Sequence, residues 1–351
     1  MAWGQWEERV INRNNPRQSQ AVREFLTAFG LAYDPATVEH TIALYQDGQM
    51  IATGSRGGEV LRNIAVHPDL QGEGLTATIV SALMRQGGEA GVRHFFIFTK
   101  PTAAPQFTGL GFRELARVEP QAVLLEGGLG SVQDEVKRLS AAVGDLPEGD
   151  RAALVVNCNP FTRGHQAVIA RAAAAHAGVV VLVVSEDRSL FPFAVRLRLV
   201  QEGVSHLPNV RVVEAGKYII SAATFPDYFT RGEDTVIAQT RLDAHVFGRY
   251  IAPGLGVSVR YVGEEPYCEV TRAYNQALQE VLPSYGVKVV EIPRLAEGSE
   301  PISASRVREL LRQGAGWEQV TPLVPESTLR YLRSSAAVEV LAAIRASDSR
   351  H

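Results

Sequence analysis

Two different patterns of hydrophobic positions follow one another along the chain. In the first third, short apolar runs are separated by turn residues, and Asp47-Gly48 between two such runs favours a β-hairpin. A helix that runs through Ala82 and Leu83 is expected between two further strands. This pattern predicts an α+β domain with strands at residues 41–45, 50–54, 60–66 and 94–99.

The second half of the chain alternates apolar strands with helices. Repeated strand–helix units predict a parallel sheet with helices on both of its faces. Small ligands bind such sheets at the carboxyl ends of the strands, where the strand order reverses. The fold class expected here is α/β, a Rossmann-like doubly wound parallel sheet whose strands are 152–156, 179–184, 210–213, 257–262 and 287–292.

One short helix is expected between these two patterns. Val132, Val136, Leu139 and Val143 share one face at the helical period, and segments rich in Gly and Pro flank them. We place the domain boundary inside this region. The predicted organisation is a first domain of residues 1–130, a linker helix within 131–150 and a second domain of 151–351 that ends in helices.

Composition narrows the function classes. The 351 residues suit two domains, and 46% apolar with 21% charged residues are ordinary for a globular protein. A net charge of −3 argues against a nucleic-acid partner, and the sequence has no apolar run of about 18 residues for spanning a membrane. The first residues do not resemble a signal peptide, and Cys158 and Cys268 form no disulfide or metal pattern. We expect a cytoplasmic protein without metal-ligating residues of its own.

The candidate chemistry begins directly behind the first strand of the second domain. Asn157-Cys158-Asn159-Pro160-Phe161-Thr162-Arg163-Gly164-His165 leads from that strand into an Ala-rich helix. Backbone N–H groups, the Thr162 hydroxyl and the His165 imidazole then surround the positive end of a helix, where phosphate binds. A second segment, Ile302-Ser303-Ala304-Ser305-Arg306-Val307-Arg308, opens another helix, and Ser303 is also a good N-cap residue.

Together these segments resemble the paired signatures of the nucleotidyltransferase superfamily, a (H/T)xGH loop and an ISSTxxR helix start. The resemblance implies that Thr162 and His165 donate hydrogen bonds to the α-phosphate of ATP and that Arg308 supplies a counter-charge. It also implies a nucleotide-binding set of Asn157, Asn159, Pro160, Phe161, Gly164, Arg188, Ser303 and Ser305.

The sequence defines the roles of the basic residues that follow the next two strands less clearly. Arg188 follows Ser185-Glu186-Asp187, a polar stretch that an ordinary turn explains equally well. Arg196 is interpreted as a charge behind the site or on the surface of a helix. Whether Arg188 or Lys217 is the main phosphate ligand stays open.

In the first domain, Gln71-Gly72-Glu73-Gly74-Leu75-Thr76 resembles the pyrophosphate loop of the GNAT acetyltransferases. His67-Pro68 before it and Leu110-Gly111-Phe112 after it fit the same family. Thr76 stands where Gly or Ala is expected, and no Tyr lies between Phe98 and Phe112 to protonate a CoA thiolate. A GNAT-like fold without acetyltransferase catalysis is therefore expected, and CoA binding is left open.

Longer stretches resemble the citrate lyase ligase family. They are Phe96–Pro101, Asn157–His165, Tyr218–Ser221 with Ala223–Pro226, Thr240–Asp243, and Tyr261–Pro266 followed by Val270–Asn275. The resemblance implies an ATP-dependent, AMP-forming ligase that activates acetate as acetyl-AMP, releases pyrophosphate and acetylates a thiol. That thiol belongs to a dephospho-CoA-derived prosthetic group on the citrate lyase acyl carrier subunit, and its acetylation switches the lyase on.

The expected chemistry needs no protein base, because the carboxylate of acetate is already ionised at neutral pH. Catalysis then reduces to positioning and charge neutralisation by the residues above and by Mg²⁺ on the phosphates. Two hypotheses refine this scheme. Phe225, Tyr228 and Phe229 shape a small pocket that rejects longer acids, and the first domain holds the pantetheine arm of the carrier rather than free CoA.

Three alternative functions use parts of the same features. The first is the same chemistry on a malonate decarboxylase carrier, and the second is adenylyl transfer to a phosphate ester such as phosphopantetheine. The third is acetyl-CoA-dependent protein acetylation, against which Thr76 and the missing Tyr argue. The sequence leaves the oligomeric state and the carrier-docking surface open.

Overall fold

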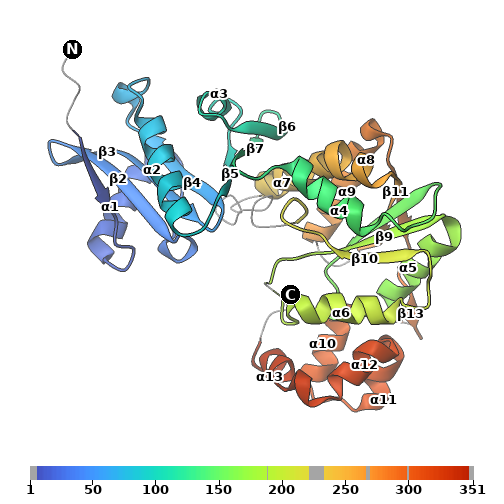
Figure 1. The fold of residues 1–351 in the computed structure, drawn as a ribbon. Helices are drawn as coiled ribbons and strands as arrows, with labels where there is room; N and C mark the ends of the chain where they lie inside the picture. The colour runs from blue at the N-terminus through green and yellow to red at the C-terminus, as the bar shows by residue number, and fades with distance from the viewer. Residues whose placement is uncertain (1–5, 188, 221–232, 266–268, 299, 348–351) are drawn as a thin grey trace. The chain divides into compact units, whose positions relative to one another are not determined.

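The computed structural model describes residues 6–187, 189–220, 233–265, 269–298 and 300–347 (Figure 1). These residues form two compact units. The first comprises residues 6–131 with 233–242, and the second comprises the described residues of 132–220 and 243–347. Within the described ranges, no helix combines the length and the apolar character needed to cross a membrane.

A mixed sheet is the centre of the first unit, and its strand order is β1-β2-β3-β4-β5-β7-β6. Neighbouring strands are antiparallel except β4 and β5, which run parallel and pair at Val60 with Phe96 and at Leu61 with Ile97. The strands are β1 (Glu7–Val10), β2 (His40–Gln46), β3 (Gln49–Gly57), β4 (Val60–Val66), β5 (His94–Thr99), β6 (Arg113–Val118) and β7 (Ala122–Gly128).

One core of the first unit lies between this sheet and its longest helix, and a second core contains Val22 and Leu26 of another helix. The helices are α1 (Pro16–Thr27), α2 (Leu75–Glu89) and α3 (Ala104–Thr108). Ile79 and Leu83 of α2 are fully buried, and Gly54 of β3 allows their close approach, because a Cβ at Gly54 would overlap Ile79 Cγ2. The predicted hairpin and GNAT-like α+β fold are confirmed, whereas β1, α1, α3, β6 and β7 were not predicted.

The second unit is built on a parallel sheet of order β10-β9-β8-β11-β12 (Figure 1). Every residue of β9 is buried, as expected for a central strand that is covered on both faces. The strand order reverses between β8 and β11, so the predicted doubly wound fold is confirmed. The strands are β8 (Arg151–Val156), β9 (Gly178–Val183), β10 (Val210–Glu214), β11 (Val257–Gly263) and β12 (Lys288–Ile292), with a short pair β13 (Ala296–Glu297) and β14 (Glu300–Pro301).

Helices cover both faces of this sheet and form two separate cores. Ile169 of α5 and Leu199 of α6 belong to one core, and Leu139 of α4 and Leu278 of α9 belong to the other. The helices are α4 (Val132–Ala142), α5 (Arg163–Ala175), α6 (Phe193–Gly203), α8 (Ala252–Leu255), α9 (Glu269–Val281), α10 (Ala304–Arg312), α11 (Trp317–Val320), α12 (Glu326–Leu332) and α13 (Val338–Ala346). Of α7 (Glu233–Val246), residues 233–242 belong to the first unit and residues 243–246 to the second.

The C-terminal helices extend the core on the α5–α6 face. Val307 of α10 and Leu329 of α12 are buried in it, and the Ser327 hydroxyl donates to the Leu199 carbonyl at 3.1 Å. This packing brings the beginning of α10 to the carboxyl edge of the sheet, where the loop after β8 begins α5.

Candidate active site

The loop after β8 ends in a closed capping box at the start of α5. Thr162 is the buried N-cap residue, and its hydroxyl accepts from the His165 N–H at 3.4 Å. The Thr162 backbone N–H in turn donates to His165 Nδ1 at 3.1 Å, and the Thr162 hydroxyl oxygen lies 2.9 Å from the same nitrogen. Both side chains are thereby fixed at the positive end of the helix dipole.

This contact determines which nitrogen of His165 carries the proton. A backbone N–H can only donate, so Nδ1 accepts and the neutral ring holds its proton on Nε2. Burial lowers the pKa of His165 to about 4, and the charge of Arg294 acts in the same direction. At neutral pH the side chain is therefore an uncharged Nε2–H donor at the start of α5.

Arg196 of α6 holds the loop that precedes this helix. Its side chain is fully buried and makes five hydrogen bonds, all to oxygen atoms of the surrounding loops. Nη1 donates to the carbonyl and side-chain oxygens of Asn157, both at 3.0 Å, and to the Val184 carbonyl at 2.8 Å. Nη2 donates to the Glu186 carbonyl at 2.7 Å, and Nε donates to the Phe191 carbonyl at 3.0 Å. Of the two positions expected for Arg196, the one behind the site is confirmed and the one on the helix surface is wrong.

The two sequence motifs meet through Arg308. Its Nη1 donates to the Asn159 carbonyl, 149 residues away in the chain, and its Nη2 donates to the Ser305 hydroxyl at 3.3 Å. Asn159 Oδ1 accepts from the Phe191 N–H at 3.1 Å, so the loop is also bound to the residues before α6. Arg308 is buried, and this burial lowers its pKa. In this structure Arg308 joins α10 to the β8–α5 loop.

Direct packing also joins the beginnings of α5 and α10. A Cβ at Gly164 would lie 3.2 Å from the Ile302 carbonyl oxygen, so the absent side chain gives room to the α10 segment. Ser303 caps α10, and its hydroxyl accepts from the Arg306 N–H at 3.1 Å. Ser305, the second residue of the same helix, is exposed in its first turn. Two helix N-termini with hydroxyl side chains therefore lie side by side.

The rest of the loop is buried behind His165. The Asn159–Pro160 peptide bond is cis, and Phe161 is fully buried with its ring stacked on His165 at a centroid distance of 6.1 Å. The Phe161 carbonyl accepts from the Thr328 hydroxyl at 2.9 Å. Cys158 is buried with a φ of 55°, and burial raises its pKa, so it is a structural residue of the loop.

Sequence reasoning missed Arg294, which follows β12 at the same edge of the sheet. Arg294 Nε donates to the Glu264 carbonyl at 2.8 Å, and Nη2 pairs with the Glu265 carboxylate. Its charge acts on His165, as the pKa of that residue shows. The available signal was its position, since it comes directly after a strand of the parallel sheet.

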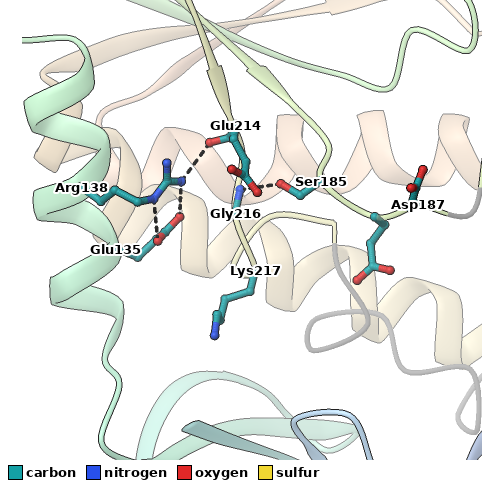
Figure 2. A pocket seen from close by; sticks show the side chains of 8 residues that line it. Glu135, Arg138, Ser185, Asp187, Glu214, Gly216 and Lys217 are labelled. Atoms are coloured by element: carbon teal, nitrogen blue, oxygen red, sulfur yellow. Dashed lines mark hydrogen bonds and ion pairs between the residues drawn. The ribbon is translucent and has the colours of Figure 1, made fainter. Parts of the chain in front are cut away.

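A pocket of about 440 Å³ lies beside the loop, at the ends of β9 and β10 (Figure 2). The Gly216 N–H donates to the Ser185 hydroxyl at 2.9 Å, and Lys217 follows on the pocket wall. Figure 2 shows Arg138 of α4 bound to Glu135 and to the Glu214 carbonyl on the opposite side.

The structure thus brings together the predicted residues of both motifs. These are Asn157, Asn159, Pro160, Phe161, Thr162, Gly164, His165, Ser303, Ser305 and Arg308. Arg188, Phe225, Tyr228 and Phe229 lie outside the described residues. Among the residues that are described, no group of three or more His, Cys, Asp or Glu side chains forms a metal cage.

Comparison with known proteins identifies the relatives of this chain. The family model of the citrate lyase ligase C-terminal domain matches residues 151–332. A citrate (pro-3S)-lyase ligase of Klebsiella pneumoniae is 36% identical over 332 residues, which cover 93% of this chain and 96% of the relative. The Escherichia coli K12 protein of that name is 36% identical over 333 residues, which cover 92% and 93%.

The chain belongs to the citrate lyase ligase family. A phosphopantetheine adenylyltransferase of Mannheimia succiniciproducens is 44% identical over 57 residues, 16% of this chain and 36% of that protein. The crystal structure of the Escherichia coli ribosomal-protein-S18-alanine N-acetyltransferase covers 36% of this chain at 17% identity and a TM-score of 0.30. The strand order of the first unit carries its fold assignment.

Replacing Arg196 tests whether it holds the loops together. Arg196→Met keeps an apolar side chain of similar length but leaves the buried carbonyls of Val184, Glu186 and Phe191 without their donor. We expect the free energy of unfolding to fall by about 3 kcal/mol or more, because each unsatisfied buried polar group costs about 1–3 kcal/mol. Urea unfolding followed by circular dichroism measures the change.

The matched control is Arg198→Met on the same helix. The Arg198 side chain is 53% exposed and lies 3.8 Å from Glu202, so its loss should cost less than about 1 kcal/mol. An equal loss of unfolding free energy in the two variants would contradict the role given to Arg196.

The proton position on His165 is open to direct measurement. In ¹⁵N-resolved NMR spectra of the imidazole, we expect Nε2 protonated and Nδ1 unprotonated at pH 7, with a titration midpoint near 4. Because this pKa lies below the unfolded value of about 6.5, the folded state should lose stability as the pH falls from about 6.5 toward 4. A midpoint near 6.5, or a proton on Nδ1, would contradict the geometry.

Proposed function

We propose that the protein activates acetate with ATP as acetyl-AMP and then acetylates the thiol of the prosthetic group on the citrate lyase acyl carrier subunit. Membership of the citrate lyase ligase family supports the ligase activity, the use of ATP and citrate lyase as the partner. The observation that carries the chemistry is the uncharged His165 Nε2–H at the start of α5, with the beginning of α10 bound beside it through Arg308.

The first step is attack of an acetate oxygen on the α-phosphate of ATP. A P–O bond to acetate forms, the bond between the α-phosphorus and the bridging oxygen breaks, and pyrophosphate leaves. Acetate is ionised at neutral pH, so no protein base is required. The site has to align the two anions and to stabilise the charge that builds on the α-phosphate oxygens.

His165 is suited to this task because it donates a hydrogen bond without needing to be charged. Thr162 fixes the ring and its tautomer, so the donor is oriented before the nucleotide binds. The N-termini of α5 and α10 add backbone N–H groups and the positive ends of two helix dipoles. We assign Ser303 and Ser305 to the β- and γ-phosphates on this basis.

The remaining predicted residues shape the nucleotide site. The β8–α5 loop at this site is built from Asn157, Asn159, Pro160 and Phe161. Gly164 lets α10 approach this loop. Arg308 holds the loop to α10 and adds positive charge close to the phosphates. Mg²⁺, when bound to the ATP phosphates, neutralises part of their charge.

The test is acetate-dependent exchange of pyrophosphate into ATP by the purified protein, which reports the first step without the carrier. We expect exchange in the wild type and a loss of about 10²–10³-fold in His165→Ala, the size of effect seen when one donor to a transition-state oxyanion is removed. The matched control is His206→Ala, since His206 is exposed on the same unit and should leave exchange unchanged.

Two results would contradict the proposal. If exchange required a phosphate ester such as phosphopantetheine instead of acetate, the protein would be an adenylyltransferase. If His165→Ala retained wild-type exchange, the site would lie elsewhere. Comparing acetyl transfer to the holo-carriers of citrate lyase and of malonate decarboxylase then identifies the partner.

A further inference from the structure

The pocket in Figure 2 shares no lining residue with the two sequence motifs, but it lies at the same edge of the sheet. Its wall includes Ser185, Glu186 and Asp187, which directly follow β9. Arg196 donates to the Glu186 carbonyl and to Asn157, so one guanidinium group binds both the pocket wall and the β8–α5 loop. The Asp187 carboxylate accepts from the Phe193 N–H at 2.8 Å and joins the same wall to α6.

The opposite wall is equally well defined. The segment after β10 is fixed by the Ala215 N–H, which donates to the Val183 carbonyl at 2.9 Å, and by the bond from Gly216 to Ser185. Arg138 of α4 binds the Glu214 carbonyl at 3.0 Å. These bonds fix the walls of an open pocket at the carboxyl edge of the sheet, where ligands of such folds bind.

We propose that this pocket receives the amide-containing pantetheine arm of the acyl carrier and delivers its thiol to the acetyl-adenylate. This inference rests on the proposed function. It places the second substrate on the second unit, at the edge of the sheet where the β8–α5 loop leads to His165. The nucleotide stays at the starts of α5 and α10.

Size and charge favour such an occupant. A cavity of about 440 Å³ is in the range that binds drug-sized ligands of about 300–1,000 Å³, and acetate is far smaller. Four carboxylates and two cations line it, which disfavours a polyanion such as a triphosphate. An amide chain is neutral, and its N–H and C=O groups match a lining of mixed charge. The lining residues are Glu135, Arg138, Ser185, Glu186, Asp187, Glu214, Gly216 and Lys217.

The transfer step balances with the groups present. The thiol loses its proton to solvent, and the thiolate attacks the acetyl carbonyl carbon. A C–S bond forms and the C–O bond to the phosphate breaks, so that AMP leaves with the shared oxygen. The arm has to place its sulfur beside the α-phosphate, so its binding site has to lie next to the β8–α5 loop.

The experiment blocks the pocket and measures the two steps separately. Ser185→Phe adds a ring to the pocket, while Ser185→Ala loses the same hydroxyl without adding bulk. The first readout is acetate-dependent ATP–pyrophosphate exchange, and the second is acetyl transfer from ATP and acetate to the holo-carrier and to free pantetheine.

We expect exchange in Ser185→Phe to stay within about threefold of the wild type, with transfer to both acceptors falling at least about tenfold through their KM. Ser185→Ala should transfer normally.

Wild-type transfer by Ser185→Phe would overturn the proposal and favour the first unit as the site of the arm. Loss of exchange in Ser185→Phe alone would assign the pocket to activation, and loss of carrier transfer with normal pantetheine transfer would assign it to the carrier protein. Absence of acetate-dependent exchange in the wild type would instead refute the proposed function itself.

Discussion

The candidate active site depends on one buried guanidinium group. Arg196 has no exposed surface, and its five hydrogen bonds end on the oxygens of four different loop residues. Burying a charge in this way is costly, and burial lowers the pKa of Arg196. The cost is offset because the carbonyls at the ends of β8 and β9 would otherwise lack donors. The loops therefore have one arrangement in which all of these groups are satisfied.

That arrangement places two helix starts against each other. Thr162 and His165 satisfy one another at the beginning of α5, and Ser303 caps α10. The bond from Arg308 to the Asn159 carbonyl joins them across 149 residues. The same loops then serve two purposes. They orient a neutral donor toward the phosphate position, and they form one wall of the neighbouring pocket.

Much of this arrangement was predictable because the signals are local. A strand followed by a Pro-containing loop and a Thr-x-Gly-His helix start identifies the first half of the site, and a Ser N-cap identifies the second. The strand–helix alternation predicts the parallel sheet. The predicted strands of the second unit agree with β8–β12 to within a residue or so at each end.

The contacts that complete the site depend on tertiary packing and were not predictable. An Arg on an amphipathic helix is usually exposed, and only the assembled loops show that Arg196 is buried among carbonyls. Arg294 and Thr328 belong to no sequence motif. Each acts through a contact with a residue far away in the chain, Arg294 with the Glu264 carbonyl and Thr328 with the Phe161 carbonyl. The close approach of Gly164 to Ile302 also has no local signal, because the two residues lie far apart in the sequence.

The central claim is that an acetate oxygen attacks the α-phosphate of ATP. Acetate labelled with ¹⁸O tests it in a single turnover with ATP and the holo-carrier, followed by mass spectrometry of the products. The account predicts one ¹⁸O atom in AMP and none in pyrophosphate, because the shared oxygen stays on the phosphorus when the thiol takes the acetyl group. Unlabelled AMP, or ¹⁸O in the pyrophosphate, would contradict it.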